Sequence, residues 1–150
     1  MADIIRTAQY FKATVPDKPG EAARALSALR NGGVNLLAFS GFPRNRRAQL
    51  DFVVSDAAAF KAAAKKDKLK VQGPKACILV EGDDRPGAGA ELTTKLAAAK
   101  INIIALQAIS AGTGRYAAIL WVKPRDVKKA EKALAMQAFH SAFNNPMGIM

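Results

Sequence analysis

Cysteine and histidine are almost absent: the 150 residues contain one of each, Cys77 and His140. A single cysteine excludes an internal disulfide framework, and one cysteine with one histidine cannot supply a four-ligand zinc cluster. No apolar run approaches the ~20 residues that cross a bilayer, and the start Met-Ala-Asp-Ile-Ile-Arg lacks the basic-then-apolar order of a secretory signal. We therefore expect a cytoplasmic protein without a membrane partner, a metal ion or a cofactor.

Acidic residues are also few. Twelve Asp and Glu stand against 23 Lys and Arg, which gives a formal net charge of +11. Residues 1–75 hold 14 basic and 6 acidic side chains, whereas residues 76–150 hold 9 and 6, so the net charges of the halves are +8 and +3. Such an excess makes nucleic acid or another anion a candidate partner. The basic side chains concentrate at Arg44, Arg46 and Arg47 and over residues 61–70, but no aromatic stacking series accompanies them, so nucleic acid is the second hypothesis.

What the sequence does contain is the composition of a globular protein, with 50% hydrophobic and 23% charged residues. Its length suits one average domain or two small ones. The sequence repeats at a shift of 67 residues, which places Asp-Lys-Pro-Gly at 17–20 on Asp-Arg-Pro-Gly at 84–87, and Asn35 on Asn102. Both Asp-to-Asn separations are 18 residues. A co-spaced repeat of this kind indicates one small unit used twice.

Hydrophobic periodicity predicts the same order of elements in both copies. We predict strands at 10–15, 34–42 and 49–54 and at 76–80, 101–109 and 116–122; we predict helices from 21 and over 57–66, then around 92–99 and over 127–135. Leu69 to Val71 is the candidate closing strand of the first copy. The corresponding segment of the second copy, Met136 to His140, is not strand-like, and residues 141–150 show no pattern.

This order predicts an α+β protein made of two βαββαβ, ferredoxin-like modules, at 1–73 and 74–137, with a C-terminal tail at 138–150. Modules of about 65–70 residues bury only about 60% of their unfolded surface. We therefore expect their antiparallel sheets to pair side by side, with the helices on one face, and two chains to form a homodimer.

The doubled Asp-x-Pro-Gly turn and the co-spaced Asn35 and Asn102 resemble the ACT domain, a βαββαβ ligand-binding module of allosteric control in amino-acid metabolism. The resemblance covers residues 8 to 135 and is closest to stand-alone proteins built of two such modules. It implies a non-enzymatic regulatory protein that binds an amino acid at an interface between modules and acts on a regulated enzyme. In this family the ligand is held by the turn of one module and by second-strand groups of another.

The chemistry of these residues suits an amino acid, which needs donors for its carboxylate and acceptors for its ammonium group. Proline at the helix start leaves the following amides free to bind an anion, and glycine lets a ligand approach the backbone. The Asp carboxylates can accept from the ammonium group, and an Asn amide can serve either end. The candidate ligand-binding residues are Asp17, Pro19, Gly20, Asn35, Asp83, Asp84, Pro86, Gly87, Ala88, Gly89 and Asn102.

The two turns differ in charge. Glu21 places a negative charge at the first helix start, whereas Ala88 and Gly89 leave the second open and Asp83 adds an acceptor. We therefore expect the second turn to be the better binder. Alternation places Phe39 and Leu106 on the same strand face as Asn35 and Asn102, where they suit an apolar ligand side chain or simply the core.

Plainer explanations stay open for each motif. An Asp before Pro-Gly is commonly a helix N-cap, and an Asn after a helix is commonly a stop signal. The protein is alternatively a scaffold that dimerises without a ligand. No paired carboxylates, nucleophile with a base, or metal-ligand set is legible, so we expect no enzyme. The sequence leaves open which amino acid binds, which module binds it, and the partner.

Overall fold

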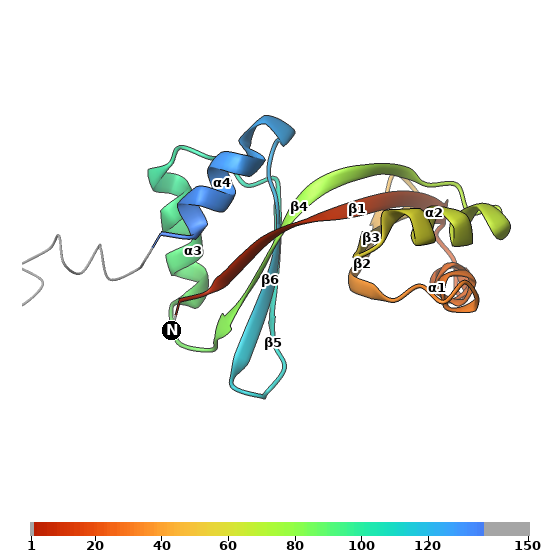
Figure 1. Ribbon diagram of the computed structural model, residues 1–150. Coiled ribbons are helices and arrows are strands. Elements are labelled where there is room, and N and C mark those ends of the chain that lie inside the picture. The colour runs from red at the N-terminus through yellow and green to blue at the C-terminus, as the bar shows by residue number, and fades with distance from the viewer. Residues whose placement is uncertain (1, 137–150) are drawn as a thin grey trace, which may run out of the picture. The chain divides into compact units, whose positions relative to one another are not determined.

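The computed structural model describes residues 2–136 and contains six strands and four α-helices. Met1, residue 137 and the predicted tail at 138–150 with His140 lie outside the described residues. The elements, drawn in Figure 1, are β1 (Ile4–Pro16), α1 (Glu21–Asn31), β2 (Leu36–Arg44), β3 (Arg47–Val54), α2 (Ala57–Lys66), β4 (Gln72–Asp83), α3 (Ala88–Ala98), β5 (Ala105–Ser110), β6 (Arg115–Trp121), a short 3-10 helix (Pro124–Asp126) and α4 (Val127–Leu134). The predicted α+β class is confirmed, and the predicted elements follow in the predicted order except for the closing strand of the first copy.

The strands follow the order β2-β3-β1-β4-β6-β5 in the sheet. The pairs β1–β3, β2–β3, β4–β6 and β5–β6 are antiparallel. The chain forms two compact units, which we call the first unit (Ala8–Ala76) and the second unit (residues 2–7 with 77–136). Because β1 has 13 residues and β4 has 12, each of these strands contributes to both units.

The core of the first unit lies between the sheet and the helices α1 and α2 (Figure 1). Phe11 of β1 and Phe52 of β3 are paired across the sheet and are almost fully buried. Phe60 of α2 stacks on Phe11 with ring centroids 4.5 Å apart and lies 5.3 Å from Phe52. Alternate residues of the strands therefore supply one face for the helices, as the period-2 pattern predicts.

The second unit has its own core, formed by β4, β6, α3 and α4. Ile78 and Leu120 are directly opposed on β4 and β6 and are completely buried. Leu92 and Leu96 of α3 and Leu134 of α4 are buried at helical spacing. Both helices thus present one apolar stripe, which explains why their periodicity was legible in the sequence.

The predicted closing strand at Leu69 to Val71 is wrong. These residues lie outside any strand, and β4 begins at Gln72. The reason is the exit from α2: Lys68 has a φ of +56°, and the Leu69 N–H donates to the Ala64 carbonyl at 2.8 Å. This helix-ending geometry occupies the residues that the apolar pattern assigned to the strand.

The fourth strand segment of the second unit comes from the other end of the sequence. Residues 4–7 of β1 belong to this unit, and β1 lies beside β4 in the sheet order. The Thr7 hydroxyl donates to a Glu131 carboxylate oxygen of α4 at 2.7 Å. The predicted contiguous division at residue 73 differs from these two units, because residues 2–7 belong to the unit that contains α4.

Among residues 2–136, no helix is both long and apolar enough to cross a bilayer.

Candidate functional site

Both Asp-x-Pro-Gly turns lead into a helix through a glycine in the left-handed region. Gly20 is the N-cap of α1 at a φ of +93°, and Gly87 is the N-cap of α3 at +86°. Neither helix start has a side-chain cap hydrogen bond. Asp17 and Asp84 are therefore not N-caps, and their glycines are required by backbone conformation.

The first turn keeps part of its backbone donors available. The Arg24 N–H donates to the Gly20 carbonyl at 2.9 Å, and the Glu21 N–H reaches the Lys18 carbonyl at 3.5 Å. Within residues 2–136, no acceptor is found for the N–H groups of Gly20 and Ala22. These donors lie at the positive end of the α1 dipole, where an anionic group is favoured.

An open cavity of about 400 Å³ adjoins this turn. Its wall combines the turn, the start of α1 and residues of the β2–β3 hairpin. Only Asp17, Lys18 and Glu21 carry charge there, and the other lining side chains are apolar. The lining residues are Val15, Pro16, Asp17, Lys18, Glu21, Ala22, Phe39, Gly41, Phe42, Pro43, Ala48 and Leu50.

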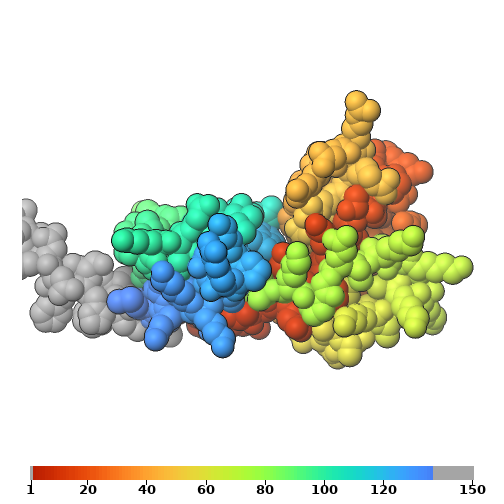
Figure 2. Space-filling model, turned by 90° about the horizontal axis from the view of Figure 1, so that it is seen from above, coloured from red at the N-terminus to blue at the C-terminus, as the bar shows by residue number. Residues whose placement is uncertain are grey.

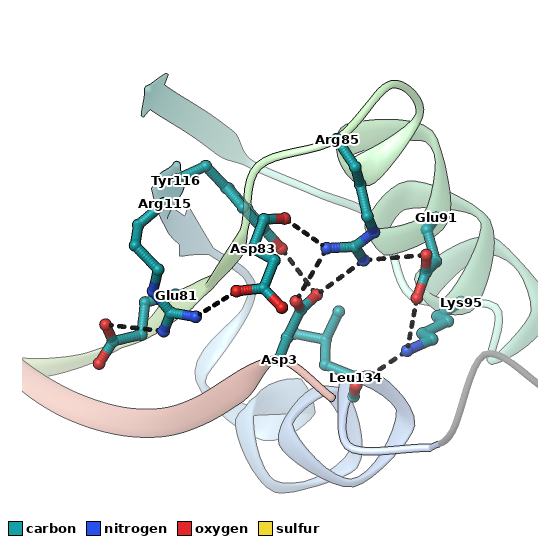
Figure 3. A network of polar contacts seen from close by, with 9 residues as sticks. All are labelled: Asp3, Glu81, Asp83, Arg85, Glu91, Lys95, Arg115, Tyr116 and Leu134. Atoms are coloured by element: carbon teal, nitrogen blue, oxygen red, sulfur yellow. Dashed lines mark hydrogen bonds and ion pairs between the residues drawn. The ribbon is translucent and has the colours of Figure 1, made fainter. Parts of the chain in front are cut away.

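The equivalent position in the second unit is filled. In the first unit Val15 pairs with Ala48, whereas in the second unit the matching pair is Gly82 with Tyr116. The Tyr116 ring thus stands where the first unit has a methyl group, and the Arg85 guanidinium lies 5.8 Å from the ring centroid. The Tyr116 hydroxyl donates to Asp3 at 2.7 Å (Figure 3).

The charges of the second turn are engaged within their own unit. Asp84 accepts from the Ser110 hydroxyl at 2.6 Å, and its N–H donates to the Gly114 carbonyl at 2.9 Å. Asp83 accepts from Arg115 at 2.9 Å. The residue of the first unit that corresponds to Ser110 at the 67-residue shift is Pro43, which has no hydroxyl group. Asp17, which is exposed, therefore lacks the serine donor that Asp84 has. The expectation that the second turn is the more open one does not match this geometry.

The two asparagines do not lie beside the turn of their own unit. At the end of the strands beside the turn, Ala48 pairs with Pro43 and Val15. At the other end, Val54 pairs with Leu36 and Gln9. Asn35, which precedes Leu36, is therefore at the opposite end of the strands from the turn, about 20 Å away by strand rise. Asn102 is placed in the same way before β5, and both asparagines are exposed.

The remaining candidates flank the turns. Pro19, Gly20, Pro86, Gly87 and Gly89 are exposed. Ala88 is buried, and its N–H reaches the Arg85 carbonyl at 3.3 Å. Sequence reasoning did not single out Asp3 and Tyr116, because neither residue belongs to the repeated Asp-x-Pro-Gly motif. Phe39, which lines the cavity, was a sequence candidate only because strand alternation places it on the same face as Asn35. Within residues 2–136, no group of three or more His, Cys, Asp or Glu is placed to hold a metal ion.

No protein-family model matches the sequence, and no curated protein sequence matches it. Solved structures do match. Protein BT0572 from Bacteroides thetaiotaomicron superposes with a TM-score of 0.75 at 18% identity, over 87% of this chain and 88% of that one. The regulatory subunit of aspartate kinase from Thermus thermophilus, in its ligand-free form, gives 0.65 at 21%, over 91% and 98%. The Thermus flavus regulatory subunit gives 0.58 at 19%, over 95% and 97%.

The chain is therefore similar in fold, over nearly the full length of these chains, to regulatory subunits of aspartate kinase. The described residues share with these subunits an α+β fold in which four helices accompany a six-stranded sheet. At these identities the likeness concerns the fold. The ligand chemistry has to be argued from the residues of this chain.

Proposed function

We propose that this chain is a non-enzymatic regulatory protein of two ACT-like modules that binds an amino acid at the turn of the first unit. The observation that carries the proposal is the open cavity beside residues 17–22, which combines charged groups of both signs with an apolar wall. The similarity to regulatory subunits supports the regulatory role at the level of fold.

The cavity offers a partner for each part of an amino acid. The N–H groups of Gly20 and Ala22, with Lys18 nearby, suit the carboxylate. Asp17 and Glu21 suit the ammonium group, so the glutamate that we expected to repel a ligand becomes an acceptor when the ammonium end faces it. The apolar wall suits an aliphatic or aromatic side chain.

The proposed site is completed by another module. Asn35 lies at the end of its unit away from its own turn, so it can serve a ligand only at the turn of a different module. Exposed apolar side chains lie at equivalent places along β2 and along β5 with the residue before it, and they provide a surface for association. These are Leu37, Phe42, Ile104 and Ile109, at 38%, 38%, 59% and 69% exposed. We propose a homodimer that acts on an enzyme partner in the cytoplasm.

The test is a thermal-shift screen of the common amino acids. A ligand at 100 times its dissociation constant stabilises the protein by about 2.7 kcal/mol, which raises Tm by about 5–10 °C. Gly20→Asp places a carboxylate at the proposed carboxylate site and abolishes the shift. Gly87→Asp is the matched control, because both glycines have a similar φ and neither has an atom within 4 Å of an added Cβ. A shift lost equally in both variants, or absent from wild type, contradicts the proposal.

A second candidate function rests on the hairpin between β2 and β3. Its residues 41–47 are all exposed, and the hairpin projects from the surface of the first unit in Figure 2. Arg44 is partly engaged by Gln49 at 3.2 Å, while Arg46 lies at the tip with a φ of +65°. If this surface binds nucleic acid, affinity falls steeply with salt and charge reversal at 44, 46 and 47 removes it. A scaffold without a ligand instead dimerises, and it shows neither a thermal shift with amino acids nor salt-dependent binding of nucleic acid.

A further inference from the structure

The Asp3 side chain is only 2% exposed, although it lies next to the chain start. Its carboxylate receives hydrogen bonds from two side chains of the second unit (Figure 3). Arg85 donates through Nη1 to Oδ1 at 3.2 Å and through Nη2 to Oδ2 at 3.4 Å, and the Tyr116 hydroxyl donates to Oδ2 at 2.7 Å. A bidentate guanidinium and a phenol are donors that recognise a carboxylate group.

The backbone of β4 is shaped for this carboxylate. A Cβ added at Gly82 would overlap Asp3 Oδ1 and come within 2.8 Å of Asp3 Cγ. It would also meet the Tyr116 ring at 3.0 Å. The first unit has Val15 at the corresponding position, so glycine is a requirement of the second unit alone.

The donors are held in place by their own partners. Arg85 donates to the Asp83 carbonyl at 2.8 Å and to Glu91 at 3.0 Å, and Lys95 lies 3.5 Å from Glu91. Burial, and then the hydrogen bond to Asp3, raise the pKa of Tyr116 well above its ordinary value, so the phenol stays protonated. Asp3, Arg85, Tyr116, Glu91 and Lys95 thus form one connected polar network around a buried carboxylate.

We propose that Gly82, Arg85 and Tyr116 form a carboxylate-binding pocket and that the chain's own Asp3 occupies it as an internal ligand. While Asp3 is bound, the second turn is closed to free ligands. When Asp3 is removed or displaced, the pocket accepts a small monocarboxylate. This pocket is separate from the cavity of the first unit and does not rest on the function proposed for that cavity.

The test is rescue by a carboxylate of matching size. Asp3→Ala removes a group of the size of formate, and Asp3→Gly removes a group of the size of acetate. We expect formate to raise the Tm of Asp3→Ala, and acetate that of Asp3→Gly, relative to sodium chloride at equal ionic strength. A dissociation constant of about 10 mM gives an increase of about 4 °C at about 100 mM carboxylate. Trimethylacetate, which is too large, gives none.

Two controls separate binding from a general salt effect. Asp56→Ala also removes a stabilising aspartate, since Asp56 accepts from the Ala59 N–H at 3.0 Å, but leaves no such pocket. Its Tm responds to formate no more than to chloride. Asp3→Ala combined with Arg85→Gln loses the rescue, because the ion pair with the added carboxylate is gone.

The proposal is overturned if formate shifts Asp3→Ala no more than it shifts Asp56→Ala, or if trimethylacetate works as well as formate. If Asp3→Ala is unfolded in chloride, we expect formate to restore its far-ultraviolet circular dichroism. Failure of formate to refold that variant likewise overturns the proposal.

Discussion

Single substitutions between the two copies decide which turn is open. Ala48 in one copy and Tyr116 in the other occupy the same place against the sheet, and Lys18 corresponds to Arg85. The small Ala48 side chain leaves room for the cavity in the first unit, whereas Tyr116 and Arg85 fill the second together with Asp3. The repeated motif at 17–20 and 84–87 is equally legible in both copies, so the motif alone could not distinguish them.

A buried carboxylate in the first unit makes stability depend on pH. Asp51 of β3 is 6% exposed and accepts from the Gln49 amide at 3.1 Å. Burial raises its pKa above the ordinary 3.8, against the opposing effects of Gln49, Lys12 and Arg44. The folded state therefore binds more protons, so Asp51 lowers the free energy of unfolding as pH rises through the window above 3.8.

We accordingly expect Asp51→Asn to be more stable than wild type at about pH 7, with the gain shrinking as pH falls toward 3.8. Urea unfolding at several pH values measures it. An asparagine variant that is less stable at neutral pH would show that the charges of Lys12 and Arg44 outweigh burial.

At the scale of elements, local signals placed the helices well. α2 spans Ala57–Lys66 as predicted, and α1 begins at Glu21 directly after its glycine. The strands extend differently from their apolar runs: β1 and β4 are longer, and β5 begins only at Ala105 although the apolar run starts at Ile101. Helix starts carry local chemistry, whereas strand ends depend on where the partner strand stops.

Alanine substitutions at two helix glycines, Gly32 and Gly89, are expected to change stability in opposite directions. A Cβ at Gly32, the C-cap of α1, would lie 2.5 Å from the Ala63 Cβ of α2. Gly32→Ala therefore pushes the two helices apart and costs about 1–3 kcal/mol. Gly89→Ala in α3 meets no atom within 4 Å and stabilises the protein by about 0.5–1 kcal/mol through helix propensity. Chemical denaturation measures both, and equal effects would contradict the close α1–α2 contact.

At the scale of the whole molecule, β5 is an edge strand whose six residues are all exposed. Edge strands with apolar side chains pair readily with another chain. If a second copy covers this surface, as proposed, Ile109→Lys shifts sedimentation at micromolar concentration from dimer toward monomer. Ile4→Lys, at a residue 52% exposed outside β5, leaves the distribution unchanged. A wild-type protein that sediments as a monomer would exclude the proposed homodimer.

The sequence by itself determined what depends on neighbours in the chain: the α+β class, the order of elements, the helix starts and the doubled turn. Periodicity and turn chemistry are local, so one sequence suffices to recognise them. The tertiary structure alone decided that residues 4–7 and 72–76 provide the closing strand segments, that Asn35 lies away from its own turn, and that Asp3 fills one of two similar sites. These outcomes depend on which distant residues meet, and a contact between Asp3 and Tyr116 across 113 positions leaves no local trace in a single sequence.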